Sequence, residues 1–334
     1  MNLERNIPDK IFSDVTIVVQ GPISKLTEKS LLSVRKYLPK SHIILSTWKG
    51  SDCSGLDYDE LVLSDDPQVN TSYPTNLNRM IVSAFAGLKE VKTKYVLRMR
   101  TDFILTGINF INLFFLKQPE AKEYKFFEKR VVSYVWKSKK GRLFQCGDFF
   151  FFGLTKDVIK LFDIPLCKKE EFFWLNNNKA NNPSLKKGNP NRYHAEQYLW
   201  LNMMKSAGFD VELQDYIHYS KELKELSERV FVNNLIFTSF LDFSIFTGKS
   251  NLLKFNYPIQ TRRYSFFDWN DLCKKYFNFN SEYKPKNPNA ILRFLFKSTV
   301  LFSGFISIFM PNQKLRRKVR FLGNYIALKV FLTK

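Results

Sequence analysis

The chain has 334 residues, 45% hydrophobic and 16% aromatic, which excludes a largely disordered protein and allows one large domain or two ordinary ones. Its 52 Lys and Arg against 31 Asp and Glu give a formal charge of +21, which attracts nucleic acid, anionic membranes or phosphorylated small molecules. The four cysteines have no CxxC spacing and do not cluster with the three histidines, so neither a zinc site nor a disulfide framework is expected.

The first hundred residues alternate short apolar runs with helical patterns. The β-branched run at 15–19 stops at Gly21-Pro22, which indicates a buried strand followed by a loop. The order strand, helix, strand, strand, helix, strand indicates an α/β fold with a mostly parallel sheet flanked by helices. The predicted elements are strand 15–19, helix 25–38, strand 43–45, strand 61–63, helix 78–88 and a strand that begins at Tyr95.

Each of these strands ends in small or polar residues. In open α/β sheets, ligands bind outside the carboxyl ends of the strands, so parallel strands would bring these residues to one edge. Arg98, Arg100 and Asp102 lie at or near the end of the last strand, which indicates a polar ligand site at this edge. A buried Arg–Asp pair that holds a loop is the alternative to such a site. No GxxxxGK[ST] or GxGxxG loop occurs. The polar ends are Gln20-Gly21, Ser46-Thr47, Ser64-Asp65-Asp66 and Arg100-Thr101-Asp102.

The second half of the chain contributes two further carboxylates. Asp148 stands at the start of a phenylalanine-rich predicted strand, where a turn or cap role is the alternative. Glu196 lies in the first turn of a predicted helix, where a favourable interaction with the helix dipole is the alternative. The remaining predicted elements are strand 131–136, helix 155–162, a surface excursion over 165–192, helix 194–208, strand 211–213 and helix 221–235.

The end of the chain differs in character from the rest. Residues 258–292 interleave aromatic and basic residues, and Pro285 and Pro288 suggest a linker. Residues 293–334 contain nine Lys or Arg and no acid, next to an apolar run shorter than the roughly 20 residues that a spanning helix needs. An apolar run beside a basic cluster is typical of a segment that lies in the membrane interface. Helices packed on the domain are the alternative.

Several ordered motifs resemble the WavE family of lipopolysaccharide-synthesis proteins. They cover the first 105 residues most clearly and continue more loosely at 147–153 and 194–200. The resemblance implies a glycosyltransferase with a GT-A-like (Rossmann-like) nucleotide-sugar fold. The motifs are Val-Val-Gln-Gly-Pro-Ile at 18–23, Ile-Leu-Ser-Thr-Trp at 44–48, Leu-Val-Leu-Ser-Asp-Asp-Pro at 61–67, Asn-Leu-Asn-Arg-Met at 76–80 and Arg-Met-Arg-Thr-Asp at 98–102.

The resemblance also implies a donor site. GT-A enzymes usually hold a divalent cation on the donor diphosphate with a DxD motif, but here Arg100 replaces the first carboxylate. We expect Asp102 to hold Mg²⁺ or Mn²⁺ with the diphosphate; alternatively Arg98, Arg100 or Arg79 neutralises the diphosphate directly. The donor's base and ribose are expected against Gln20, Gly21, Pro22, Thr47, Asp65 and Asp66, its phosphates beside Asn78 and Arg79, and the catalytic base at Glu196 or Asp148.

The whole sequence therefore predicts a catalytic domain over 1–220, a helical or linker region over 221–292 and a basic amphipathic tail over 293–334. Within the catalytic domain, the donor half covers about 12–110 and the acceptor half about 130–220. The expected reaction transfers a sugar, such as a hexose from UDP, to a lipid-linked or oligosaccharide acceptor of lipopolysaccharide or capsule.

The N-terminus carries no hydrophobic signal region, so we expect a cytoplasmic protein, peripheral on the inner face of the plasma membrane. A non-catalytic scaffold of a membrane assembly is the alternative function. A nucleic-acid-binding protein, suggested by the charge of +21, is a second alternative function. Nucleic acid is nevertheless not an expected partner, because no RNA- or DNA-binding motif occurs.

Overall fold

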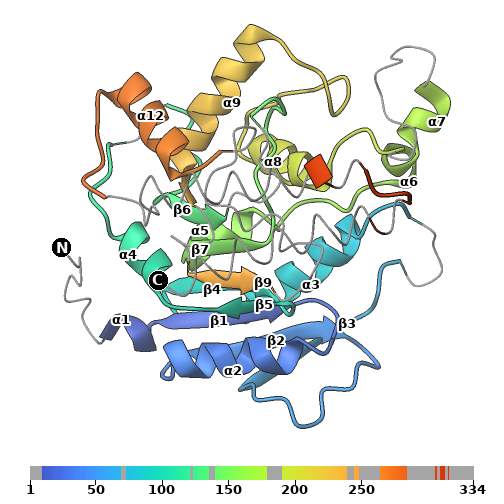
Figure 1. The fold of residues 1–334 in the computed structure, drawn as a ribbon, viewed down its shortest axis with the longest axis vertical. Helices are drawn as coiled ribbons and strands as arrows, with labels where there is room; N and C mark the ends of the chain where they lie inside the picture. Colours follow the sequence, from blue (N-terminus) through green and yellow to red (C-terminus); the bar gives the residue numbers. More distant parts are fainter. Residues whose placement is uncertain are drawn as a thin grey trace.

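A central seven-stranded sheet organises the part of the chain that the structure describes (Figure 1). The computed structural model describes residues 10–68, 73–120, 123–134, 140–178, 190–238, 244–247, 264–283, 305–306, 309–312 and 315. The strand order is β3-β2-β1-β4-β7-β6-β8, and β5 pairs separately with β9. The strands are β1 Val15–Gln20, β2 His42–Trp48, β3 Glu60–Ser64, β4 Tyr95–Arg100, β5 Phe103–Leu105, β6 Val131–Tyr134, β7 Phe150–Leu154, β8 Leu235–Thr238 and β9 Ile245–Thr247.

Strand direction decides which residues meet at the edge of the sheet. Strands β3, β2, β1 and β4 are mutually parallel, and β6 is parallel to β8. Strand β7 runs antiparallel to both β4 and β6. The amino end of β7, and Asp148 just before it, therefore lies at the edge where β1 and β4 end. The predicted α/β fold with a mostly parallel sheet is confirmed.

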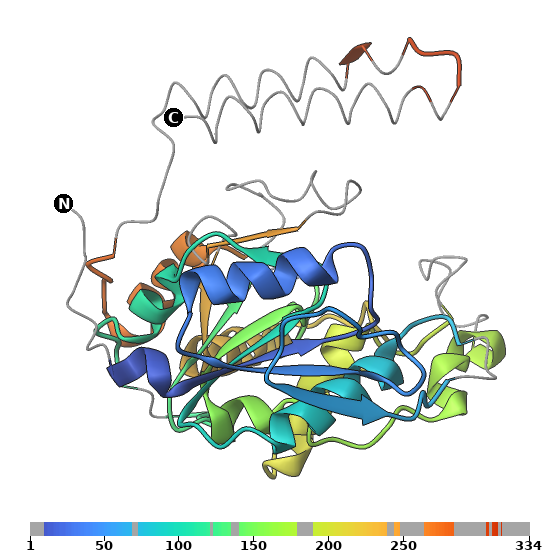
Figure 2. The same cartoon turned by 90° about the horizontal axis from the view of Figure 1, so that it is seen from below.

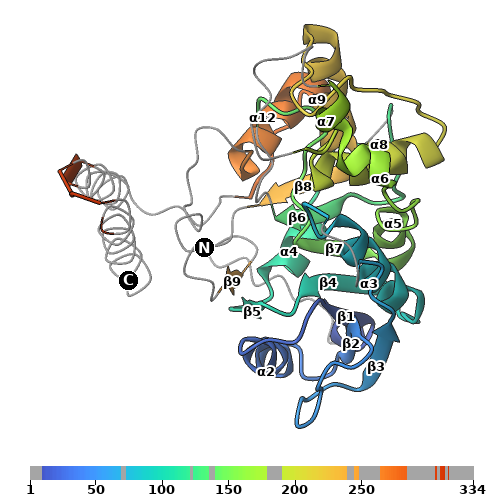
Figure 3. The ribbon, with the colours of Figure 1, turned by 90° about the vertical axis from the view of Figure 1, so that its right-hand side faces the viewer.

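Helices cover both faces of the sheet. Helix α2 lies on one face, and α3 and α5 lie on the other (Figures 2 and 3). The phenylalanine run explains why both faces are covered: Phe152 packs edge-on against Phe110 and Phe114, whereas Phe151 packs against Phe162. The helices are α1 Lys10–Ser13, α2 Thr27–Tyr37, α3 Leu77–Lys89, α4 Asn109–Phe114, α5 Thr155–Lys160, α6 Lys169–Phe172, α7 Trp174–Asn178, α8 Ala195–Ser206, α9 Lys221–Asn234 and α12 Phe266–Phe277.

The strand predicted at 211–213 is wrong. The carbonyl oxygen of Leu213 accepts hydrogen bonds from the side chains of Arg192 (3.2 Å) and Tyr193 (2.6 Å) instead of from a neighbouring strand. The excursion over 165–192 contains the short helices α6 and α7. Most of the basic tail at 293–334 lies outside the described residues. Within the described residues, no helix combines the length and the hydropathy needed to cross a membrane.

Gly87 sets how closely α3 approaches the sheet. A Cβ atom there would lie 2.7 Å from Cγ1 of Val18 and 2.8 Å from Cβ of Ser46. We expect Gly87→Ala to lower the free energy of unfolding by about 1–3 kcal/mol, because helix and sheet would have to separate. Urea unfolding measures this effect. The control is Gly141→Ala, where a Cβ meets nothing within 4 Å; an equal loss in both variants would contradict the close packing.

Candidate functional site

A cavity of about 550 Å³ opens at the carboxyl edge of the sheet. In Figure 1 this edge faces α3 and α8. Residues from both halves of the chain line it, because the antiparallel β7 and the start of α8 bring Asp148 and Glu196 to the ends of β1 and β4. The residues predicted from the sequence that line the cavity are Gln20, Gly21, Pro22, Asp66, Arg79, Arg98, Arg100, Asp148 and Glu196.

Arg98 is the buried cation of this cavity. Its side chain is 0% exposed and donates from Nη1 to the carbonyl oxygen of Asp148 and from Nη2 to Oε1 of Gln20. The guanidinium also lies 4.8 Å from the centre of the Phe162 ring. Burial lowers the pKa of Arg98 to about 9, against the opposing effect of the Asp148 charge, so the group stays charged at neutral pH. Both of these hydrogen-bond acceptors are neutral groups.

Arg100 and Asp102 form a bidentate pair. Nε and Nη2 of Arg100 donate to the two carboxylate oxygens of Asp102 at 3.0 and 2.8 Å. The Asp102 side chain is only 5% exposed, whereas that of Arg100 is 32% exposed and lies 4.8 Å from the Phe149 ring centre. The buried Arg–Asp pair considered from the sequence is therefore present, and Arg100 also lines the cavity.

The residues around Asp102 do not fit a metal site in this arrangement. A carboxylate that holds Mg²⁺ or Mn²⁺ presents an oxygen to the ion, but both oxygens of Asp102 already accept N–H groups from Arg100. Among the residues that the structure describes, no group of three or more His, Cys, Asp or Glu side chains could hold a metal ion. Of the two expectations from the sequence for the diphosphate, neutralisation by arginine fits these contacts better, and the cation at Asp102 is left for experiment to test.

Arg79 and Asp66 form a second ion pair at the cavity wall. Nε of Arg79 donates to both oxygens of Asp66 at 2.8 and 3.0 Å, and Nη2 donates at 2.7 Å. This contact lowers the pKa of Asp66 and raises that of Arg79. Asn76 also accepts from Arg79 Nη1 at 3.1 Å, which fixes the guanidinium at the start of α3.

Gly21 turns the chain sharply after β1. Its φ is +131°, a conformation that other residues rarely adopt, and a Cβ atom there would lie 3.2 Å from Oγ1 of Thr101. That hydroxyl donates to the carbonyl oxygen of Pro22 at 2.8 Å. The loop after β1, which lines the cavity, is thus tied to the turn after β4.

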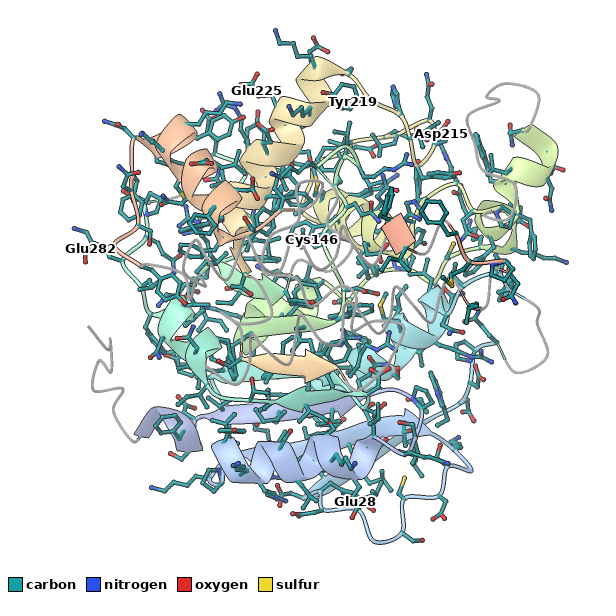
Figure 4. All side chains as sticks on the ribbon, in the orientation of Figure 1. Glu28, Cys146, Asp215, Tyr219, Glu225 and Glu282 are labelled. Atoms are coloured by element: carbon teal, nitrogen blue, oxygen red, sulfur yellow. The ribbon has the colours of Figure 1, made fainter. Side chains whose placement is uncertain are left out.

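Glu196 is held by the start of α8. The N–H of His194 donates to Oε1 of Gln197 at 3.1 Å, and Gln197 Nε2 donates to the carbonyl oxygen of Leu143 at 3.0 Å. The Glu196 side chain accepts from Gln145 Nε2 at 3.3 Å and is 1% exposed as a residue. The segment that carries Gln145 can be found in Figure 4 by the label of Cys146, the next residue in the sequence. Glu196 is therefore a positioned carboxylate at the cavity wall.

Four predicted site residues do not line the cavity. The Thr47 hydroxyl is buried 3.3 Å from that of Ser51, and Asp65 is exposed and pairs with Lys49 at 2.8 Å. Asn78 makes two hydrogen bonds with the backbone of Cys167, at 3.0 and 2.8 Å, which attach α3 to the segment before α6. Asp102, the fourth, is only 5% exposed and pairs with Arg100.

The cavity also includes residues that the sequence did not single out. Trp48 follows Ser46-Thr47 at the end of β2, and its position at a polar strand end was the available signal. Tyr193 and His194 immediately precede α8, close to Glu196. The others are Thr75, Asn76, Leu77, Met80, Phe149, Asn191 and Ala195.

Comparison with models of known protein families identifies the family of this chain. A model of the WavE lipopolysaccharide synthesis family matches residues 15–300, which is most of the sequence. The chain belongs to the WavE family. Membership supports a glycosyltransferase that acts in the synthesis of a surface glycan. The family resemblance expected from the sequence is thus confirmed.

Comparisons with individual proteins add little to the family match. No curated protein sequence matches this WavE-family chain. Among solved structures, S. aureus TarS 1-349 is similar over 96% of this chain and 91% of that chain, with 11% identity and a TM-score of 0.28. A likeness this low carries no argument about function.

Proposed function

We propose that this WavE-family chain transfers a sugar, such as the hexose of a UDP-hexose, to a growing lipopolysaccharide or capsule glycan. The observation that carries the proposal is the cavity at the carboxyl edge of the sheet, which combines a buried guanidinium, Arg98, with a positioned carboxylate, Glu196. Sugar transfer needs a cation for the departing diphosphate and a base for the acceptor hydroxyl.

Arginine side chains neutralise the diphosphate in this proposal. The guanidinium of Arg98 donates hydrogen bonds to two neutral groups. Its electric field in the cavity is strong, because little water screens a buried charge. Arg100, at 32% exposed, offers the donor direct contact, and Arg79 stands at the neighbouring wall. Guanidinium groups bind phosphate oxygens in a bidentate manner, which suits a diphosphate.

The base and ribose of the donor lie against the loop after β1 and the end of β2. Gly21 and Pro22 line the cavity on this side. The indole of Trp48 offers a surface on which a nucleobase can stack. Asp66 lies at the same wall, where both of its oxygens accept from Arg79. Thr47, Asp65 and Asn78 are not assigned donor contacts, because their side chains do not line the cavity.

The transfer step needs a proton acceptor beside the anomeric carbon. In a direct displacement, the acceptor hydroxyl oxygen forms a bond to the anomeric carbon and passes its proton to Glu196. The bond from that carbon to the phosphate oxygen breaks, and its electron pair leaves with the diphosphate towards Arg98 and Arg100. Asp148 is the second candidate for the base, because it lines the same cavity.

Membrane association is part of the proposal. The nine basic residues at 293–334, without any acid, would attract the anionic inner leaflet of the plasma membrane and bring a lipid-linked acceptor close to the cavity. Binding of UDP-sugars, RNA and anionic vesicles, measured in one parallel series, tests the whole proposal. Binding of vesicles without UDP-sugars would favour a scaffold, and preferential binding of RNA would overturn the glycosyltransferase assignment.

Donor binding is expected to proceed without a divalent cation. Because Asp102 is occupied by Arg100 and arginines carry the phosphate charge, UDP should raise the melting temperature equally in EDTA and in Mg²⁺ or Mn²⁺. A thermal shift assay measures this. A shift that occurs only with a divalent cation, and that is lost in Asp102→Asn, would instead assign Asp102 as the metal ligand.

A further inference from the structure

A second cavity, of about 370 Å³, lies beside α8. We propose that it binds an uncharged sugar unit of the acceptor glycan; this inference rests on the proposed function. Tyr193 lines both this cavity and the main one, so the two cavities are neighbours. Because Tyr193 is three residues before Glu196, a glycan seated in the second cavity has a short path to the proposed base.

One face of α8 forms a wall of the second cavity. Tyr198, Leu201, Asn202 and Lys205 line it and lie three or four residues apart, the spacing of a single helix face. Glu196 belongs to the same helix but lines the main cavity. Helix α8 therefore connects the two cavities rigidly and holds the proposed base at a constant distance from the second cavity.

The charges around the second cavity compensate one another. Arg192 pairs with Glu171 at 3.3 Å and with Glu212 at 2.8 Å, and Lys205 pairs with Asp210 at 3.6 Å. Lys168 is the remaining lining cation. This balance suits a neutral polyol better than a phosphate or a polyanion, in contrast to the main cavity, where the contacts of Arg98 are neutral groups.

The lining presents both surfaces that a sugar ring needs. Sugars have apolar C–H faces and hydroxyl edges, and the tyrosine rings offer apolar faces with fixed orientation. Tyr193 Oη donates to the carbonyl oxygen of Leu213 at 2.6 Å, and Tyr198 Oη donates to that of Pro165 at 3.2 Å. The ion-paired Arg192 and Glu171 offer donors and acceptors for hydroxyls at the edge.

The test fills the second cavity and leaves the main one intact. The probes are neutral methyl hexosides and methyl heptosides, observed by saturation-transfer NMR with the full chain and saturating UDP. We expect at least one glycoside to bind together with UDP. In Asn202→Trp its dissociation constant should rise by about tenfold or more, while the UDP affinity stays unchanged. Lys29→Trp adds the same side chain to an exposed position of α2, on the opposite face of the sheet, and should bind like the wild type.

The outcomes separate this inference from the proposed function. The inference is overturned if no glycoside binds, if every glycoside competes with UDP, or if Asn202→Trp binds glycosides as well as Lys29→Trp does. Val211→Trp fills the cavity from outside α8 and replaces Asn202→Trp if that variant does not fold. Failure of the wild type to bind any UDP-sugar contradicts the proposed function alone, because glycoside binding is then measured without UDP.

Discussion

Replacing Glu196 with glutamine is expected to lower the rate of sugar transfer by about 10²–10⁴-fold, the usual contribution of a general base. The amide cannot take the proton of the acceptor hydroxyl at neutral pH. It keeps an oxygen that can accept the 3.3 Å hydrogen bond from Gln145, so the start of α8 and the donor site should not change. The measurements are UDP release in the presence of acceptor and the dissociation constant of UDP.

Asp148→Asn is the matched comparison for Glu196→Gln. Asp148 lines the same cavity, and its backbone carbonyl, which holds Arg98, is unaffected by a side-chain amide. If Glu196 is the base, Asp148→Asn should retain most of the turnover. A large loss in Asp148→Asn together with full turnover in Glu196→Gln would move the assignment to Asp148. A loss of UDP affinity in Glu196→Gln would indicate a role in donor binding instead.

Local pattern was sufficient to predict the parallel half of the sheet. Each of β1, β2, β3 and β4 is an apolar run that ends in polar residues, and its place in the chain follows the strand–helix rhythm. The strand pairs that the sequence did not reveal join short strands that are far apart in the chain, such as β5 and β9. At 211–213 a three-residue alternation suggested a strand, but Arg192 and Tyr193 use the carbonyl group of Leu213.

The site could be predicted only where strand ends determine it. Gln20, Arg98 and Arg100 follow from parallel strands that end at one edge. The position of Asp148 depends on the antiparallel direction of β7, which no local pattern encodes. Asn78 shows the opposite case: it lies one position before Arg79 in sequence, yet α3 turns its side chain towards the backbone of Cys167. Which of two adjacent helix residues faces the cavity depends on the rotation of the helix and on its tertiary contacts.

Arg98→Met is expected to weaken both the fold and the binding of UDP. The methionine fills much of the buried space but leaves the Gln20 oxygen and the Asp148 carbonyl without the guanidinium that donates to them. Two buried acceptors that lose a charged donor predict a loss of about 3–5 kcal/mol in the free energy of unfolding. Urea unfolding measures the stability, and isothermal titration calorimetry below the unfolding transition measures the UDP affinity.

Arg130→Met separates the loss of charge in the cavity from the loss of a buried arginine in general. Arg130 is 6% exposed and donates to the carbonyl oxygens of Val232 and Pro119 at 2.7 and 2.6 Å, and burial lowers its pKa to about 10. It does not line the main cavity. Both variants should lose stability, but only Arg98→Met should weaken UDP binding, by about 10–100-fold for a charged hydrogen-bonding group. Equal UDP affinity in the two folded variants would remove Arg98 from the donor site, since its charge would then serve the fold alone.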